Sequence, residues 1–598
     1  MKKTKNTVSG MRPCNPSNPR QSLGRFLMTL MVMLSAIPMH ALEWEDPVTH
    51  LVYSYYGSWS TTASVEKSPG FTGTVLEIPN TVTVEGNEMD VTDISFGAFE
   101  GNTVITTLKL NDNLSYIGSY AFSGCTSLAV VECTPGCQLN YAPVDAFENT
   151  PFLNAQTGVF VINNTALGWI GGIPADGVIA FAEGIKAIGN EAFAGKTELK
   201  EVRFPESLKR IGSGSFYGCT GLTGVVIPKN VIDMDGSSFA ATSVSAFEVD
   251  PANTELKVAE DGSGAIITTD GTFFVAYPPM NIQTVYTVPQ GVTSIYSCAF
   301  MDNDKLQRLV LPEGVENVYG DAIKGTALQY LDIPSTINFI VSGAIANNEN
   351  LVTLIYRNTM PIGSYGSPFS TYSFDPAGSG TWKNGTLYVP EGSMANFTPK
   401  KEWSENFSGG VKEAALFNMP AVWATVSSRQ ALDLSTVGED FEVYAATAYA
   451  DNKVGVTRLT GIVPGNTGLL VKNVKGVAGS NCAILPSAET GMAPAANLLV
   501  AVTDAKAVDA STGNFYVLKD NMFHKMGTGT MPAFKAYLDL TGKVSGKSVD
   551  ITFENVTGIN HAVSEENAED VWHTLNGVRI KRPATKGIYI KNGKKVVF

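Results

Sequence analysis

The chain has 598 residues, of which 44% are apolar and 16% are charged. This composition excludes an intrinsically disordered chain, which would have few apolar residues and a high charge, and the length predicts several domains. The formal net charge of −14 argues against a nucleic-acid-binding protein, because contact with phosphates needs a basic surface.

The first 41 residues differ from the rest in charge. They carry six basic and no acidic residues, and their apolar run Phe26–Pro38 is too short to span a bilayer. This pattern predicts a secretory signal peptide over 1–41; a retained N-terminal anchor is the alternative. Its removal leaves 36 basic and 56 acidic residues, a net charge of −20, which argues against docking on anionic lipid. We expect no transmembrane span in the mature chain, because no later apolar run is long enough.

A repeat of about 23 residues occupies 94–410, after a segment (42–93) whose alternating residues predict a β-rich cap. Each copy has a small residue before a large apolar one, and further apolar residues six, nine and eleven positions later. Such a period indicates a solenoid, and the two-residue spacing indicates short strands with one inward face. We therefore expect a mainly β fold built of stacked coils with parallel strands. The small–large pairs begin at residues 98, 121, 146, 192, 215, 238, 299, 322 and 344.

The third position after the large residue is nearly always Asn, Cys or Thr. A turn that recurs in every coil leaves backbone groups pointing inward, and buried polar groups need partners. We therefore expect these side chains to form a structural ladder, which makes the alternative, a metal ligand or a nucleophile at the cysteines, the weaker interpretation. The predicted ladder residues are Asn102, Cys125, Cys219, Asn303 and Asn348.

The repeat resembles the BspA-type bacterial leucine-rich repeat. The resemblance rests on IGSYAFSGCTSL (117–128), IGNEAFAGKTEL (188–199) and IGSGSFYGCTGL (211–222), and covers roughly 90–407. It implies a cell-surface or secreted protein that binds protein or glycan ligands, since some members of that family are adhesins for host extracellular matrix or other bacteria. Neither periodicity nor composition identifies a ligand.

Two intervals break the period, from Phe147 to Phe193 and from Phe239 to Phe300. Each contains a hairpin-like insert, near 158–170 and 264–279, and Asp270-Gly271 is a strong turn signal. Inserts often lie on the binding face of a solenoid, so aromatic residues here are candidate ligand contacts. The alternative is that they pack back on the neighbouring coil. The candidates are Trp169, Phe273, Phe274 and Tyr277.

Six cysteines remain after residue 41, which is too few for a disulfide framework in so long an exported chain. Cys133 and Cys137 flank Thr-Pro-Gly and are placed to close a disulfide across this turn in an oxidising compartment, or to remain free thiols.

The C-terminal third contains three further segments. Short strand-like runs separated by turns predict a β-sandwich-like domain over 415–553, and the polar, acidic segment 555–570 reads as a linker. The tail 571–598 resembles the sorting domains of the type IX secretion route through Gly577, Gly587, Tyr589 and Lys594. This resemblance implies recognition by secretion machinery and a location on the outer membrane or in the medium. A last hairpin packed on the preceding domain is the alternative.

The sequence shows no catalytic constellation, metal-ligand spacing or cofactor motif. The pairs Asp233/Asp235 and Asp302/Asp304 lack the full spacing of a calcium loop and lie in repeat turns. A Cys482/His524 dyad has nothing in the sequence that brings it together. We expect a non-enzymatic binding protein without metal or cofactor, active in adhesion; the alternatives are an exported hydrolase with its site in 415–553 and a non-adhesive surface scaffold.

Overall fold

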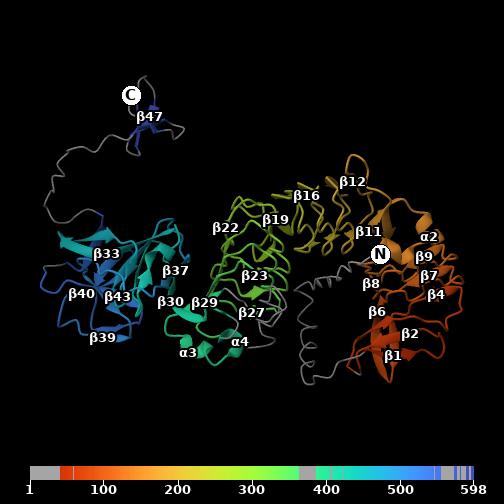
Figure 1. Cartoon of the computed structure of the whole chain (residues 1–598), viewed down its shortest axis with the longest axis horizontal. Helices are drawn as coiled ribbons and strands as arrows, with labels where there is room; N and C mark the ends of the chain where they lie inside the picture. Colours follow the sequence, from red (N-terminus) through yellow and green to blue (C-terminus); the bar gives the residue numbers. More distant parts are fainter. Residues whose placement is uncertain are drawn as a thin grey trace, which may run out of the picture.

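The computed structural model describes residues 41–57, 59–341, 343–362, 385–404, 407–420, 422–543 and 546–553, and the backbone of four strands between 572 and 597. A curved, arch-like solenoid occupies the N-terminal two thirds, and a β-domain stands at its C-terminal end (Figure 1). The predicted signal peptide, apart from Ala41, lies outside the described residues and stays a prediction.

The N-terminal cap is one sheet that leads into the solenoid. Its strands run in the order β1-β2-β3-β6-β5, and β6 buries Met89, Val91 and Ile94 while the residues between them face outward. β6 also pairs in parallel with the first short strand of the solenoid, β8 (Tyr116–Ile117). This pairing covers a sheet edge that would otherwise be open. The strands are β1 (Leu42–Glu45), β2 (Val52–Tyr55), β3 (Thr62–Val65), β5 (Thr81–Val84) and β6 (Asn87–Ile94).

Each coil of the solenoid contributes one strand to each of two rows, and neighbouring strands in a row are parallel. We call the inner face the row on the concave side of the arch, which begins with β6, β8 and β11, and the outer face the row that begins with β4, β7 and β9 (Figure 1). The inner strands are β8, β11 (Thr165–Ile170), β13 (Ala187–Ile188), β15 (Arg210–Ile211) and β17 (Asp233–Met234), continued by β21 (Phe273–Ala276), β23 (Ser294–Ile295), β25 (Asn317–Val318) and β27 (Phe339–Ile340).

Most strands of the outer row are longer than those of the inner row, and the outer row ends at the C-terminal domain. Its register places equivalent residues of successive coils side by side, for example Arg308, Tyr330 and Thr353. Parallel pairing with this register confirms the expected solenoid of about 23-residue coils. The strands are β4 (Val75–Glu77), β7 (Thr107–Leu110), β9 (Val130–Cys133), β12 (Val178–Ala180), β14 (Glu201–Arg203), β16 (Val225–Ile227), β18 (Phe247–Val249), β22 (Val285–Thr287), β24 (Arg308–Val310), β26 (Tyr330–Ile333) and β28 (Thr353–Tyr356).

The large residue of each small–large pair forms an aromatic stack through the core. Phe193, Phe216 and Phe239 are fully buried, and their ring centroids are 5.4 and 5.2 Å apart with nearly parallel planes. Removal of one such buried ring by substitution with alanine costs about 3–5 kcal/mol in proteins generally. The most regular residues of the repeat therefore stabilise the coils.

The two inserts are hairpins whose last strands join the inner row. β10 (Gly158–Ile162) pairs antiparallel with β11, and β11 pairs in parallel with β13. In the second insert β19 (Leu256–Val258), β20 (Ile266–Thr268) and β21 form an antiparallel meander, and β21 pairs in parallel with β23. The inner row is divided among three sheets, with breaks after β8 and after β17. Two short helices, η2 (Val144–Phe147) and α2 (Pro151–Asn154), precede the first insert.

The outer sheet continues from the solenoid into the next domain. β29 (Thr386–Pro390) is the last solenoid strand, followed by α3 (Met394–Phe397) and α4 (Lys401–Ser404), whose buried Trp403 packs 4.8 Å from the ring of Tyr356. β30 (Val411–Asn418) then pairs in parallel with β29 and antiparallel with β37 (Asn481–Pro486). One hydrogen-bonded sheet of nine strands thus runs from β22 to β35.

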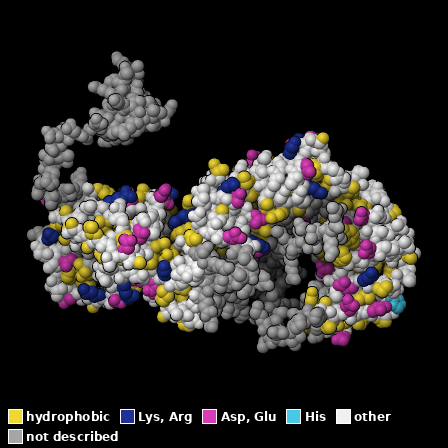
Figure 2. Space-filling model, in the orientation of Figure 1, with side chains coloured by type: hydrophobic (Ala, Val, Ile, Leu, Met, Phe, Trp, Pro, Cys, Tyr) yellow, Lys and Arg dark blue, Asp and Glu magenta, His cyan; other side chains and the backbone are white. Residues whose placement is uncertain are grey.

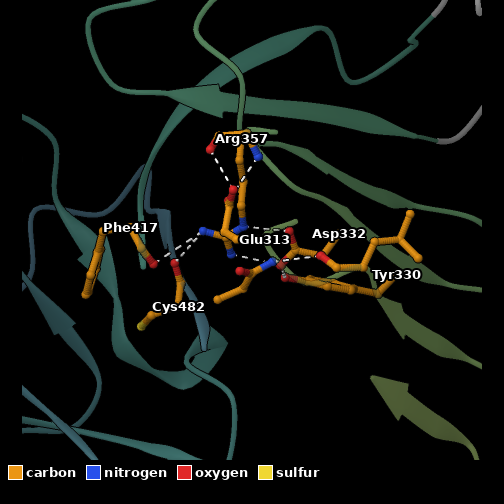
Figure 3. Close-up of polar contacts among 9 residues, drawn as sticks. Glu313, Tyr330, Asp332, Arg357, Phe417 and Cys482 are labelled. Atoms are coloured by element: carbon orange, nitrogen blue, oxygen red, sulfur yellow. Dashed lines mark hydrogen bonds and ion pairs between the residues drawn. The ribbon is translucent and has the colours of Figure 1, made fainter. Parts of the chain in front are cut away.

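A buried ion pair joins β26 to the end of β28 within this continuous sheet (Figure 3). The Arg357 guanidinium donates to both carboxylate oxygens of Asp332, at 2.7 and 2.8 Å, and both side chains are at most 3% exposed. The same guanidinium donates to the carbonyls of Cys482, at 3.0 Å, and Phe417, at 3.4 Å. Since Phe417 lies on β30 and Cys482 on β37, Arg357 joins the last coils to the second domain.

The second domain has two packed sheets. β30, β37, β32 and β35 pack against part of a nine-stranded sheet across a core that includes Met419, Val443, Val471, Cys482 and Ile484. The strands are β31 (Trp423–Val426), β32 (Leu432–Asp433), β33 (Phe441–Ala450), β34 (Lys453–Arg458), β35 (Ile462–Val463), β36 (Leu469–Asn473), β38 (Leu499–Val502), β39 (Lys506–Val508), β40 (Phe515–Lys519), β41 (Met522–Lys525), β42 (Gly529–Met531), β43 (Lys535–Asp539) and β44 (Ser548–Thr552), with the short helix η3 (Leu434–Thr436).

The tail contains a small antiparallel sheet of its own, in the order β46-β45-β47-β48. With it, the expected mainly β class, including further β-sheets after the solenoid, is confirmed. The strands are β45 (Trp572–Thr574), β46 (Arg579–Ile580), β47 (Ile588–Lys591) and β48 (Lys594–Val597).

Candidate functional site

The side chains of the predicted ladder bond to the backbone of the turns. Asn303 is buried; its Nδ2 donates to the carbonyls of Pro278 and Pro279, at 3.1 and 3.2 Å. Its Oδ1 accepts from the N–H groups of Lys305 and Leu306, at 3.1 and 2.8 Å. One side chain thereby satisfies four backbone groups in two coils, which explains the preference for a short amide here.

The two ladder cysteines play the same part with a single bond each. The thiols of Cys125 and Cys219 donate to the carbonyls of Phe99 and Phe193, both at 3.1 Å and one coil back. Burial raises the pKa of each thiol to about 11, so both are protonated at neutral pH and poor nucleophiles. In the remaining ladder positions, Asn102 Oδ1 accepts from Val104 and Ile105, and Asn348 Nδ2 donates to Ile323.

The four aromatic candidates of the inserts separate into two pairs. Phe274 and Tyr277 are buried, and both pack on Phe300 of the next coil, with centroids 4.8 and 5.4 Å apart. They are core residues and offer no surface to a ligand. Phe274 points inward by strand alternation, and Tyr277 takes the place that the large residue of a small–large pair has in other coils. Trp169 and Phe273 are half-buried and keep part of their surface.

A pair of tyrosines stands on the inner face of the first coils. Strand register places Asp93 beside Tyr116, and Tyr116 beside Tyr141. The two tyrosine rings are stacked, with centroids 4.8 Å apart and planes within 5° of parallel. Both tyrosines are half-buried. In β8 it is Ile117 that points into the core, which leaves Tyr116 on the other side of the strand. The two rings cover each other on their facing sides, and each keeps part of its surface exposed.

Three half-buried carboxylates surround the stacked tyrosines. Burial raises the pKa of Asp93, Asp145 and Glu191. The pKa of Tyr116 is raised by burial and by the charges of these same three groups. Strand register places Asp93 beside Tyr116, and the Asn190 N–H donates to the Asn140 carbonyl at 2.7 Å, which brings the coil of Glu191 against the coil of Tyr141. None of the three takes part in an ion pair among the described residues, and Asp145 Oδ1 is buried without a hydrogen-bond partner.

A second acidic group lies further along the inner face. Asp233 and Asp235 point to the same side of the chain, since Met234 between them is buried in the core. Asp235 is 2% exposed; its Oδ1 accepts from Ser237, and its Oδ2 has no partner. Burial raises the pKa of Asp235 to about 6. The neighbouring Tyr296 has its pKa raised by burial and by the charges of both aspartates.

The outer face differs in how its charges are arranged. There Lys109 lies 3.5 Å from Glu77, and Arg203 lies 2.6 Å from Glu201, all at exposed positions. Lys229 pairs with Glu206 in the same manner. Acidic side chains also gather over the N-terminal cap and first coils (magenta, lower right in Figure 2). Some outer-face carboxylates are thus paired, while Glu132 on β9 and Glu248 on β18 have no ion pair among the described residues; on the inner face, Asp93, Asp145 and Glu191 have none.

The thiols of Cys133 and Cys137 lie side by side at the end of β9. A hydrogen bond from the Cys133 thiol lowers the pKa of Cys137 to about 7, and the same contact raises that of Cys133. Both are free cysteines here. Their proximity fits the proposed disulfide, which requires only a short approach of the two sulfur atoms.

The described residues contain no group of three or more His, Cys, Asp or Glu side chains that could hold a metal ion. Cys482 lies on β37 and His524 on β41, in different sheets, and burial raises the pKa of Cys482 to about 12. Asp302 accepts a hydrogen bond from the Tyr217 hydroxyl at 2.8 Å. In the described part of the chain, no helix has the length and apolar character to cross a membrane.

Six residues described on the inner face were not singled out from the sequence: Asp93, Tyr116, Tyr141, Asp145, Glu191 and Tyr296. The sequence contains a sign of the tyrosine pair, because Tyr116 and Tyr141 lie close to the inner strand in two successive coils. The regular positions of the repeat are the buried ones, and these side chains lie outside that pattern. In the predicted sorting tail, Gly577 and Gly587 lie outside the described residues, and Tyr589 and Lys594 lie on β47 and β48.

Comparison with protein families identifies the repeat. Residues 78–166, 178–259 and 277–367 match the family model described as a BspA type leucine rich repeat region, in six copies. The coils thus match BspA-type leucine-rich repeats. The matched BspA-type repeats include the stacked phenylalanines, the turn ladder and the inner-face tyrosines. Comparison with curated proteins gives no match.

Three solved structures are similar over much of the chain. A leucine-rich cell surface protein from Faecalibacterium prausnitzii is 19% identical, with 62% of this chain and 98% of that chain covered and a TM-score of 0.31. The pneumococcal vaccine antigen PcpA is 17% identical, with 62% and 98% covered and a TM-score of 0.29. A leucine-rich repeat protein from Eubacterium ventriosum is 18% identical, with 59% and 80% covered and a TM-score of 0.31. Values this low carry no information about function.

Proposed function

We propose that this is an exported binding protein, displayed on the outer membrane or secreted, whose solenoid binds a protein or glycan ligand in adhesion to host or other cells. The observation that carries the proposal is the division of labour within the BspA-type repeats. Phenylalanines and ladder residues hold the coils together, while the inner face presents half-buried tyrosine rings and half-buried carboxylates. Leucine-rich-repeat solenoids generally use such a concave surface for binding.

The proposal extends to the two ends of the chain. Residues 1–41 direct export, and the tail 571–598 is recognised by secretion machinery. Mass spectrometry of the protein isolated from its own cells tests both: cleavage after about residue 41 and loss or modification of the tail are expected. An intact N-terminus on protein retained in the cytoplasm would contradict export.

Binding is tested with the mature protein immobilised on a biosensor. Soluble extracellular-matrix proteins and a glycan array are the probes, and circular dichroism shows that the protein is folded. We expect saturable binding to at least one member of these panels. A folded protein that binds none of them would refute adhesion and favour a scaffold that holds other surface proteins, which cross-linking on whole cells would identify.

A further inference from the structure

The unpaired carboxylates of the inner face limit the chemistry of what can cover it. A half-buried carboxylate without a counter-charge is costly, and its cost rises when a ligand excludes the remaining water. Asp93, Asp145 and Glu191 already have pKa values raised by burial. A neutral glycan laid over them would remove water without supplying positive charge. A cation would offset the desolvation.

The stacked tyrosines favour the same kind of ligand. Lysine and arginine side chains are attracted to the faces of aromatic rings, more strongly when water is excluded, and they can donate hydrogen bonds to phenol oxygens. Arg210, in the inner row between the two acidic groups, has a lowered pKa through burial and faces Asp233. The fold therefore already places one guanidinium on this surface, against a carboxylate, in the manner that a ligand cation would adopt.

Asp235 adds an independent sign that positive charge is missing. Its side chain is 2% exposed, it lies directly after β17, and its Oδ2 has no hydrogen-bond partner. Buried polar atoms are normally satisfied. Asp145 Oδ1 is a second carboxylate oxygen of these coils that is buried without a hydrogen-bond partner, whereas Glu77, Glu201 and Glu206 each have a lysine or arginine partner.

We propose that the inner face from Asp93 to Tyr296 docks a lysine- or arginine-rich segment of a protein partner. This inference rests on the proposed binding function and names the partner class for the same surface. Cationic side chains lie against the stacked tyrosines and pair with Asp145 and Glu191. The charge of the ligand, not its detailed sequence, supplies much of the association rate, so binding weakens as salt concentration rises.

The test compares two charge-matched variants of the mature protein. Asp145→Asn with Glu191→Gln removes two charges from the inner face, and Glu77→Gln with Glu201→Gln removes two from the outer face. The probes are a short fluorescent peptide of alternating lysine and serine and its glutamate–serine counterpart, measured by fluorescence polarisation at low and high salt. We expect the inner-face variant to bind the lysine peptide about tenfold more weakly and the outer-face variant within about twofold of the parent.

Two results would overturn the inference. Equal weakening in both variants would indicate a general effect of net charge, and equal binding of the two peptides would indicate no preference for cations. If a matrix protein or glycan binds the inner-face variant as tightly as the parent protein, the proposed adhesive function stands and this inference fails. If the parent protein binds no probe of any class, the proposed function itself fails. Circular dichroism and thermal unfolding of each variant exclude loss of fold as the cause.

Discussion

Arg357 provides a sharp test of how the solenoid is joined to the second domain. Its guanidinium contacts Asp332 on β26 within the solenoid and the carbonyls of Phe417 and Cys482 on β30 and β37. The substitution Arg357→Met retains most of the apolar stem and removes the charge and all of these donors. We expect a large loss of stability that is concentrated at the junction.

The magnitude follows from burial. Asp332 is 1% exposed, so removal of its partner leaves an uncompensated buried charge, which costs about 3–5 kcal/mol. Two strand carbonyls also lose a donor, which adds about 1 kcal/mol. The double variant Arg357→Met with Asp332→Leu removes the orphaned charge, so its free energy of unfolding should lie within about 1–2 kcal/mol of the parent.

Urea unfolding followed by tryptophan fluorescence and far-UV circular dichroism measures the loss. Hydrogen–deuterium exchange of 411–418 and 481–486 locates it, and these strands should exchange faster in Arg357→Met. The control is Arg429→Met, which breaks an exposed pair with Asp504 and should change stability far less than Arg357→Met, because solvent screens an exposed ion pair. Equal unfolding midpoints for Arg357→Met and the parent, or a double variant no more stable than the single one, would refute the reasoning.

Three further outcomes are expected. Burial raises the pKa of Asp235 to about 6, so the folded state binds the proton of this carboxyl more tightly than the unfolded state does. Asp235 therefore lowers the stability of the fold as pH rises through about 4 to 6. In urea unfolding, Asp235→Asn should raise the free energy of unfolding by about 2–3 kcal/mol at about pH 8 and leave it almost unchanged at about pH 4. Asn303→Ala leaves four backbone groups without their partner and should cost about 2–4 kcal/mol in thermal unfolding, and a loss below about 0.5 kcal/mol would contradict the ladder. Mature protein from an oxidising compartment should show four free thiols out of six after denaturation, and reduction should lower its stability by about 2 kcal/mol, an effect that Cys133→Ser with Cys137→Ser should abolish.

The solenoid was predictable because its determinants are local and repeated. Phe193, Phe216 and Phe239 recur at one interval, and a single register satisfies their packing in every coil. The ladder followed from the same repetition, since each turn poses the same hydrogen-bonding requirement. The sheet shared by β29 and β30 was less accessible to sequence reasoning, because the partner strand β37 lies about 70 residues further along the chain and pairing over such distances leaves little local trace.

The aromatic candidates show why surface function was harder to predict. Phe273 and Phe274 are identical neighbours, yet strand alternation exposes part of one and buries the other. Which of them faces out depends on the register of a meander with an irregular pairing between Ile266 and Ile267, and a shift of one residue would reverse the assignment. The contact between the rings of Tyr116 and Tyr141 depends on how neighbouring coils stack, and the sequence around either residue does not specify that stacking.

The sheet that runs unbroken from β22 through β30 to β35 also determines how the molecule carries load. If the C-terminal end is held at a surface and a ligand pulls on the arch, tension passes through the backbone hydrogen bonds between β29 and β30. These bonds and the Arg357 clasp lie side by side, so torque at the junction is shared among them. The solenoid and the second domain then rotate together, and the way in which the second domain is attached sets the direction in which the inner face points.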